Sequence, residues 1–95
     1  MSIENLSFPV RGITTRQVKA ARALLGWSQT DLAIHSKVSE PTIARLEAVD
    51  GPLRGRAETS SKILKALVEA GIEFIPENGG GAGVRLALSS ALKEL

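Results

Sequence analysis

Apolar residues recur every three or four positions along the first three quarters of the chain, and this spacing indicates amphipathic helices. Four such segments can be delimited, with expected bounds of 15–25, 29–36, 40–48 and 57–70. In the first segment the residues expected to face the core are Val18, Ala21, Leu24 and Leu25. Trp27 follows at once and is expected to fill the core between the first two helices. The pattern therefore predicts a mainly α domain.

Residues that favour helix ends stand at the borders of these segments. Thr14 and Gln17 have the spacing of a capping box, in which each side chain binds the backbone N–H of the other residue. Ser28 and Ser39 directly precede the second and third helices, where a side-chain oxygen can accept a hydrogen bond from an unpaired N–H. Gly26 suits the left-handed conformation that ends many helices. The second and third helices are thus predicted to be joined by a short turn.

The periodicity changes after Gly71. Residues 72–76 and 84–88 have the composition and alternation of β-strands, and the glycine-rich run 77–83 separates them. This run lacks the Lys-Ser/Thr pair of a phosphate-binding loop and does not lie between a strand and a helix, so a nucleotide site is not expected. The chain is predicted to continue as a small C-terminal β-hairpin. For residues 89–95 a short helical turn and a frayed end both stay open.

Charge and composition narrow the functional classes. The net charge is +2, and the positive excess lies in residues 1–71, which hold 10 basic and 7 acidic residues. The chain has no cysteine and a single histidine, His35, which is expected on the surface of the second helix. We therefore expect no metal, no cofactor and no enzymatic activity. No apolar run is long enough to span a membrane, and a cytoplasmic location is expected.

Two stretches in the middle of the chain resemble a known family. Residues 25–33 are Leu-Gly-Trp-Ser-Gln-Thr-Asp-Leu-Ala, and residues 38–47 are Val-Ser-Glu-Pro-Thr-Ile-Ala-Arg-Leu-Glu. Together they resemble the helix-turn-helix of the Cro/CI phage-repressor type, the XRE family, over residues 14–71. The resemblance implies a four-helix lambda-repressor-like domain that inserts the helix 40–48 into the major groove of a double-stranded DNA operator. Residues 1–13 would form an N-terminal arm.

The resemblance also implies roles for particular residues. The residues expected to read base edges are Ser39, Glu40, Pro41 and Arg45. Those expected to contact phosphates are Gln29, Thr42, Arg54 and Arg56. Arg45 can donate two hydrogen bonds to guanine, and Glu40 can accept one from a cytosine amino group. Arg22 and Glu47 match an ion pair of the family, and Lys37 stands where the family usually has a left-handed glycine.

The resemblance implies that this chain is a sequence-specific transcriptional regulator, and we expect it to act as a repressor. One alternative is an antitoxin that represses its own operon and binds a toxin through the residues after Gly71. Another is an interaction module that no longer binds DNA. Most Cro/CI-type relatives bind DNA as dimers, and residues 72–95 are the expected dimerisation segment. Its candidate contact residues are Phe74, Ile75, Val84, Leu86 and Leu88.

The sequence leaves two alternatives open for the C-terminal hairpin and two for the N-terminal arm. The hairpin could pair with a second copy across a two-fold axis, which we favour, or it could fold back on its own helices. The N-terminal arm could pack on the helices through Leu6, Phe8 and Val10, or Arg11 could touch DNA from it. The packed or disordered arm is the stronger expectation of the two.

Overall fold

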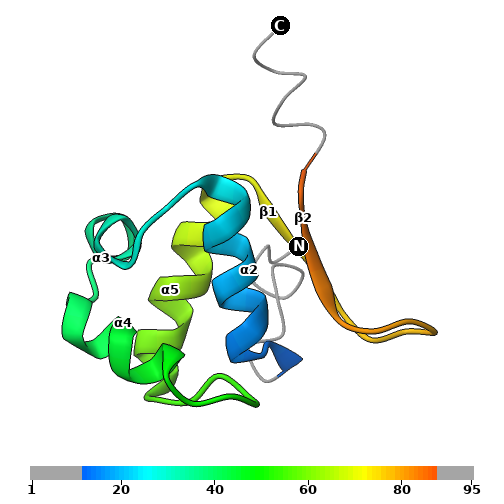
Figure 1. Ribbon diagram of the computed structural model, residues 1–95, viewed down its shortest axis with the longest axis horizontal. Helices are drawn as coiled ribbons and strands as arrows, with labels where there is room; N and C mark the ends of the chain where they lie inside the picture. Colours follow the sequence, from blue (N-terminus) through cyan, green and yellow to red (C-terminus); the bar gives the residue numbers. More distant parts are fainter. Residues whose placement is uncertain (1–11, 88–95) are drawn as a thin grey trace, which may run out of the picture.

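The structure is a computed structural model, and it describes residues 12–87. Four helices and a two-stranded antiparallel sheet follow one another along this part of the chain (Figure 1). They are α2 (Thr15–Leu25), α3 (Gln29–Ser36), α4 (Glu40–Glu47), α5 (Ala57–Glu69), β1 (Ile72–Ile75) and β2 (Gly83–Leu86). This confirms the mainly α fold class with a C-terminal hairpin. Both α4 and α5 end one residue earlier than expected, and Leu88 lies outside the described residues.

The predicted helix caps are present. The side-chain oxygen of Thr14 accepts from the Gln17 N–H at 3.2 Å, and the Gln17 side chain accepts from the Thr14 N–H at 2.8 Å. Ser28 makes the same reciprocal pair with Asp31 at the start of α3. Gly26 ends α2 with a φ of 70°. Local side-chain chemistry therefore places the ends of the first two helices.

The core lies between the four helices and receives one residue from the hairpin. Its buried apolar members are Ile13, Val18, Ala21, Leu32, Val38, Ile43, Leu46, Ile63, Leu64, Ala66, Leu67 and Ile72. Leu24 was predicted to face the core, and this prediction was wrong, because 46% of the surface of Leu24 is exposed to solvent. Leu24 lies six positions after Val18, which turns it about 120° around the helix and away from the buried stripe. Trp27 is half-buried at the edge of the core, where it stacks on the exposed His35 with ring centroids 4.2 Å apart.

The turn between α3 and α4 contains a strained residue. Lys37 has a φ of 64°, and it is the only residue other than glycine with a positive φ within the described part of the chain. A side chain in this left-handed conformation brings Cβ close to the next carbonyl oxygen. The sequence expectation for Lys37 is confirmed.

Replacing Lys37 with glycine is expected to raise the free energy of unfolding by about 1 kcal/mol, because it removes this steric strain. For a domain of this size, such a gain corresponds to a rise in Tm of about 4–8 °C. Thermal unfolding followed by circular dichroism measures it. Lys37→Ala is the matched control, because it removes the charge and keeps Cβ, and it should give no such gain. A lower Tm for Lys37→Gly would contradict the turn geometry.

The hairpin packs on the helices that precede it. Phe74 is paired with Val84 across the two strands, and both side chains pack against the core beside the buried Ile72. The Gln17 side-chain amide donates to the carbonyl oxygens of Gly83 at 2.9 Å and of Ile75 at 3.3 Å. One face of the hairpin is thus folded back on its own helices.

Within the described residues, no helix combines the length and apolar character needed to cross a membrane.

Candidate nucleic-acid interface

The helix α4 presents one face to the core and the other to solvent. Ile43 and Leu46 are buried, whereas Glu40, Pro41 and Arg45 are exposed. Pro41 stands in the first turn, where its missing N–H leaves no hydrogen bond unmade. The exposed face therefore carries three of the four side chains expected to read bases.

The N-terminus of α4 is held by a pair of hydroxyl groups. Ser39 Oγ accepts from the Thr42 N–H at 3.3 Å and donates to Thr42 Oγ1 at 2.8 Å. These bonds hold the first turn of the helix and occupy the Ser39 hydroxyl proton. In this conformation Ser39 can offer a base only its remaining lone pair, so its main contribution here is to hold the turn.

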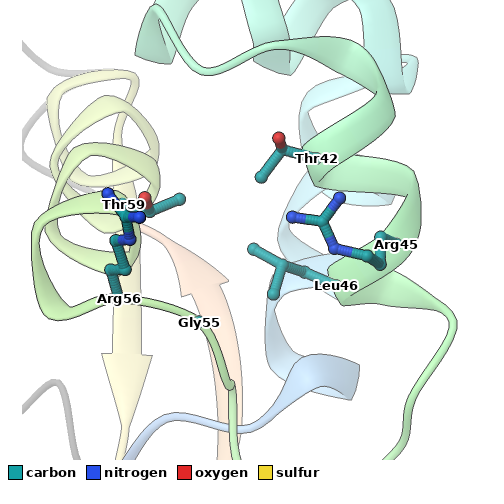
Figure 2. A pocket seen from close by; sticks show the side chains of 6 residues that line it. All are labelled: Thr42, Arg45, Leu46, Gly55, Arg56 and Thr59. Atoms are coloured by element: carbon teal, nitrogen blue, oxygen red, sulfur yellow. The ribbon is translucent and has the colours of Figure 1, made fainter.

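Arg45 and Arg56 border a common hollow between α4 and the start of α5. Figure 2 shows both side chains there, with Thr42 on the side of α4 and Thr59 on the side of α5. The hollow has a volume of about 320 Å³, and it is lined by Thr42, Arg45, Leu46, Gly55, Arg56 and Thr59. None of these lining residues is acidic. The hollow therefore combines two guanidinium groups with two hydroxyl groups, which are donors that suit an anion such as phosphate.

The loop before α5 is tied down at several points. Leu53 N–H donates to the Ile13 carbonyl at 3.0 Å, and Thr15 N–H donates to the Gly51 carbonyl at 2.9 Å. Gly55 passes over Leu46 with a φ of 95°, and a Cβ there would lie 3.0 Å from a Leu46 methyl carbon. Only glycine combines this positive φ with such a close approach. These contacts hold the loop that leads to Arg56 against the start of α2 and, at Gly55, against α4.

The predicted ion pair between Arg22 and Glu47 is present and bidentate. Arg22 Nη2 lies 2.6 Å from Glu47 Oε1, and Arg22 Nε lies 2.8 Å from Oε2. The third guanidinium nitrogen donates to the Trp27 carbonyl at 3.0 Å. The Glu47 side chain is 5% exposed and that of Arg22 is 18% exposed. The pair therefore joins the end of α4 to α2 and to the segment that leads into α3.

Gln29 is part of the same network. Its side-chain Nε2 donates to Glu47 Oε1 at 3.0 Å. Burial by itself would raise the pKa of Glu47, but the hydrogen bonds from Arg22 and Gln29, together with the charges of Arg22 and Lys19, outweigh it and lower that pKa. One hydrogen of the Gln29 side-chain amide is thus already used in the bond to Glu47. A phosphate could accept a hydrogen bond only from the second amide hydrogen or from the backbone N–H groups at the start of α3.

The structure brings some of the predicted residues together and leaves others apart. Thr42, Arg45 and Arg56 share the hollow, whereas Arg54 is exposed in the loop and does not line it. Sequence reasoning missed Thr59 and Gly55. The signal for Thr59 was its place three positions after Arg56, which puts both residues at the start of α5.

The fold and this site define a small helical domain with a helix-turn-helix unit, whose second helix is exposed beside a basic hollow. A comparison of the chain with models of protein families found no match. A comparison with curated proteins found none either.

Proposed function

We propose that this protein is a sequence-specific double-stranded DNA-binding regulator of transcription, acting as a repressor, of the XRE type that its motifs resemble. The observation that carries the proposal is the exposed face of α4 next to the hollow shared by Arg45 and Arg56. A helix that enters the major groove needs an exposed face for base edges and adjacent cations for the phosphates that flank them. Both features occur here on neighbouring elements.

The proposed division of labour follows from where the side chains lie. Arg45 projects from α4 itself, so it can follow the helix into the groove and donate two hydrogen bonds to a guanine. Arg56, which directly precedes α5, and Thr59, in its first turn, lie at the other side of the hollow, and they would bind a phosphate oxygen. Glu40 and Pro41, at the start of α4, would meet a cytosine amino group and a thymine methyl group.

Arg45→Ala is expected to weaken binding to the preferred DNA sequence by about 1–3 kcal/mol and to relax the preference at one base pair. Arg56→Ala is expected to weaken binding to all sequences alike and to reduce the dependence of affinity on salt. Both effects can be measured by fluorescence anisotropy, with DNA selected from a random pool and with single-base variants of it.

Lys65→Ala serves as the control, because it also removes one positive charge and its side chain, 72% exposed, lies on α5 outside the hollow. It should leave both affinity and base preference nearly unchanged. If Arg45→Ala kept the full base preference, the proposed orientation of α4 on DNA would be wrong. If no DNA sequence were enriched from the pool, sequence-specific binding itself would be refuted.

We further propose that the protein acts as a homodimer, with the hairpin at the contact. Phe74 and Val84 pack against the core of their own chain, so a partner must use other parts of the hairpin. Leu86 is 50% exposed at the end of β2. Its cross-strand partner is Ile72, so it shares the face of Phe74, whereas strand alternation places Ile75 on the opposite face. The five residues therefore do not form one surface, and we propose a smaller contact centred on the exposed Leu86.

Leu86→Arg is expected to convert the dimer to a monomer without unfolding it, because the change puts a charge into the proposed contact. Multi-angle light scattering at micromolar concentrations measures the mass. Ile34→Arg is the matched control on α3, where Ile34 is 65% exposed, and it should leave the mass unchanged. A monomeric wild-type protein, or a dimer that survives Leu86→Arg, would refute the hairpin contact.

A further inference from the structure

A second hollow lies where the C-terminal end of α3 packs beside the middle of α5 (Figure 1). Its volume is about 330 Å³, and its basic and acidic lining residues include Lys37, Lys62, Lys65 and Glu69. Three ammonium groups and one carboxylate give it a positive charge. It shares no lining residue with the hollow beside α4. This cluster of lysines is therefore a basic surface that the proposed DNA interface does not use.

A smaller hollow continues this surface toward the C-terminal end of α5. It has a volume of about 210 Å³ and is lined by Trp27, His35, Ala66, Glu69 and Ala70. His35, Ala66 and Glu69 line both hollows, so the two adjoin and form one groove, the α3–α5 groove. The rings of Trp27 and His35 stack with an angle of 7° between their planes. The small alanine side chains leave room beside this aromatic pair for one apolar side chain.

Lys37 keeps its place in the groove despite local strain. Its φ of 64° is the left-handed conformation that favours glycine, so a lysine at this position lowers stability. Strained residues that persist in a fold cluster at functional sites. Within the described part of the chain, Lys37 forms no ion pair with a carboxylate. Its ammonium group is therefore available to a partner.

We propose that the α3–α5 groove docks an acidic segment of a partner protein. Carboxylates of that segment lie over Lys37, Lys62 and Lys65, and one apolar side chain enters the smaller hollow beside the aromatic pair. The exposed side chains of Lys62 and Lys65 pair with Glu58 and Glu69 at 3.7 and 4.0 Å. Such exposed pairs contribute little to stability, so a partner's carboxylates can replace them at low cost.

Glu69 favours a protein segment over a nucleic acid as the occupant. It stands where the two hollows meet and would repel a phosphate there. A protein segment can place its apolar residue at that point and its carboxylates further along, whereas a nucleic acid carries a phosphate at every nucleotide. The stacked His35 also covers one face of the Trp27 ring, which closes this face to a base.

Selection from a random peptide library tests the chemistry of the partner. The full chain is expected to enrich peptides that are rich in aspartate and glutamate and carry a large apolar residue. Enrichment of no peptide, or of peptides without an acidic excess, would overturn the proposal.

Nuclear magnetic resonance then locates the bound peptide, because Trp27 and His35 are the only tryptophan and the only histidine of the chain. A synthetic copy of an enriched peptide should shift the indole N–H signal of Trp27 and the imidazole signals of His35. Binding that left these signals in place would lie elsewhere on the protein and would refute the groove as the site.

Lys62→Gln with Lys65→Gln is expected to weaken binding of this peptide about fivefold or more, measured by fluorescence anisotropy. The matched control is Arg16→Gln with Arg85→Gln, which also removes two positive charges and breaks two exposed ion pairs. It should change the affinity by less than about twofold. Equal losses in the two double variants would show a general attraction of charges only, and would overturn the proposal.

Lys37→Gly separates the two effects of this residue. It should stabilise the fold, as stated above, and yet weaken peptide binding about threefold, because it removes an ammonium group from the groove. Lys37→Arg keeps the charge and should keep the affinity. An unchanged affinity in Lys37→Gly would contradict the role of the strained lysine and with it the proposal.

A DNA duplex serves as the competing ligand. Lys62→Gln with Lys65→Gln should leave DNA affinity within about twofold, because these side chains lie outside the proposed DNA interface. A duplex that displaced the peptide and shifted the Trp27 and His35 signals would assign the groove to nucleic acid and overturn the proposal. The peptide measurements themselves contain no DNA, so a failure of the groove and a failure of DNA binding can be told apart.

Discussion

Replacing Arg22 with alanine is expected to lower the free energy of unfolding by about 3–5 kcal/mol, because it leaves the buried Glu47 carboxylate without its cation. The carboxylate loses two short hydrogen bonds at once, and only Gln29 continues to donate to it from a side chain. Urea unfolding followed by Trp27 fluorescence and circular dichroism measures the loss. The exposed pair Arg16–Asp50, with side chains 77% and 60% exposed, provides the contrast: Arg16→Ala should change stability little.

A double-mutant cycle isolates the interaction itself. Arg22→Met together with Glu47→Leu removes both charges and retains apolar bulk, and it should recover most of the stability lost by Arg22→Ala. A coupling energy near zero between positions 22 and 47 would show that the bidentate contact does not contribute to folding.

The same pair predicts how stability depends on pH. The pKa of Glu47 is lowered in the folded state. The ionised carboxylate therefore contributes to the free energy of unfolding above the ordinary pKa of a glutamate, and this contribution is lost as the pH falls through the lowered value. The loss of stability in Glu47→Gln should therefore be largest near neutral pH and should shrink in acid. A difference between wild type and variant that stayed constant from pH 7 to pH 3 would contradict this assignment.

Gln17→Glu is expected to cost about 2–3 kcal/mol at neutral pH, although the two side chains have nearly the same shape. Gln17 is 4% exposed. A glutamate can still accept from the Thr14 N–H, but its carboxylate would face the carbonyl oxygens of Ile75 and Gly83 without a proton to donate. The hairpin would therefore be pushed away from α2, and amide exchange in β1 and β2 should increase more than in α3.

The pH dependence of this variant should run in a defined direction. Burial and the two carbonyl oxygens would raise the pKa of a glutamate at position 17, so its penalty should grow as the pH rises through that value and shrink in acid. Ala20→Glu adds the same charge at an exposed site one turn along α2 and serves as the control. Equal losses in the two variants would show that the bonds from Gln17 to the hairpin contribute nothing specific.

Much of the fold was predictable because the information is local. Thr14 and Gln17 stand three positions apart, and Ser28 and Asp31 do so too, so each capping pair can be recognised within a single helical turn. The left-handed residue at 37 and the pair Arg22–Glu47 came from the resemblance to a known motif rather than from periodicity. The roles in DNA binding that the same resemblance implies stay predictions.

The tertiary structure decided what depends on contacts between distant parts of the chain. Gln17 bonds to residues 58 and 66 positions away, which no local pattern of its helix can reveal. The hollow shared by Arg45 and Arg56 exists because the loop over Gly55 holds the start of α5 against α4. The exposure of Leu24 likewise depends on which side of α2 the neighbouring elements cover. Spacing along the sequence determines which residues share a face of a helix, but only packing determines what that face meets.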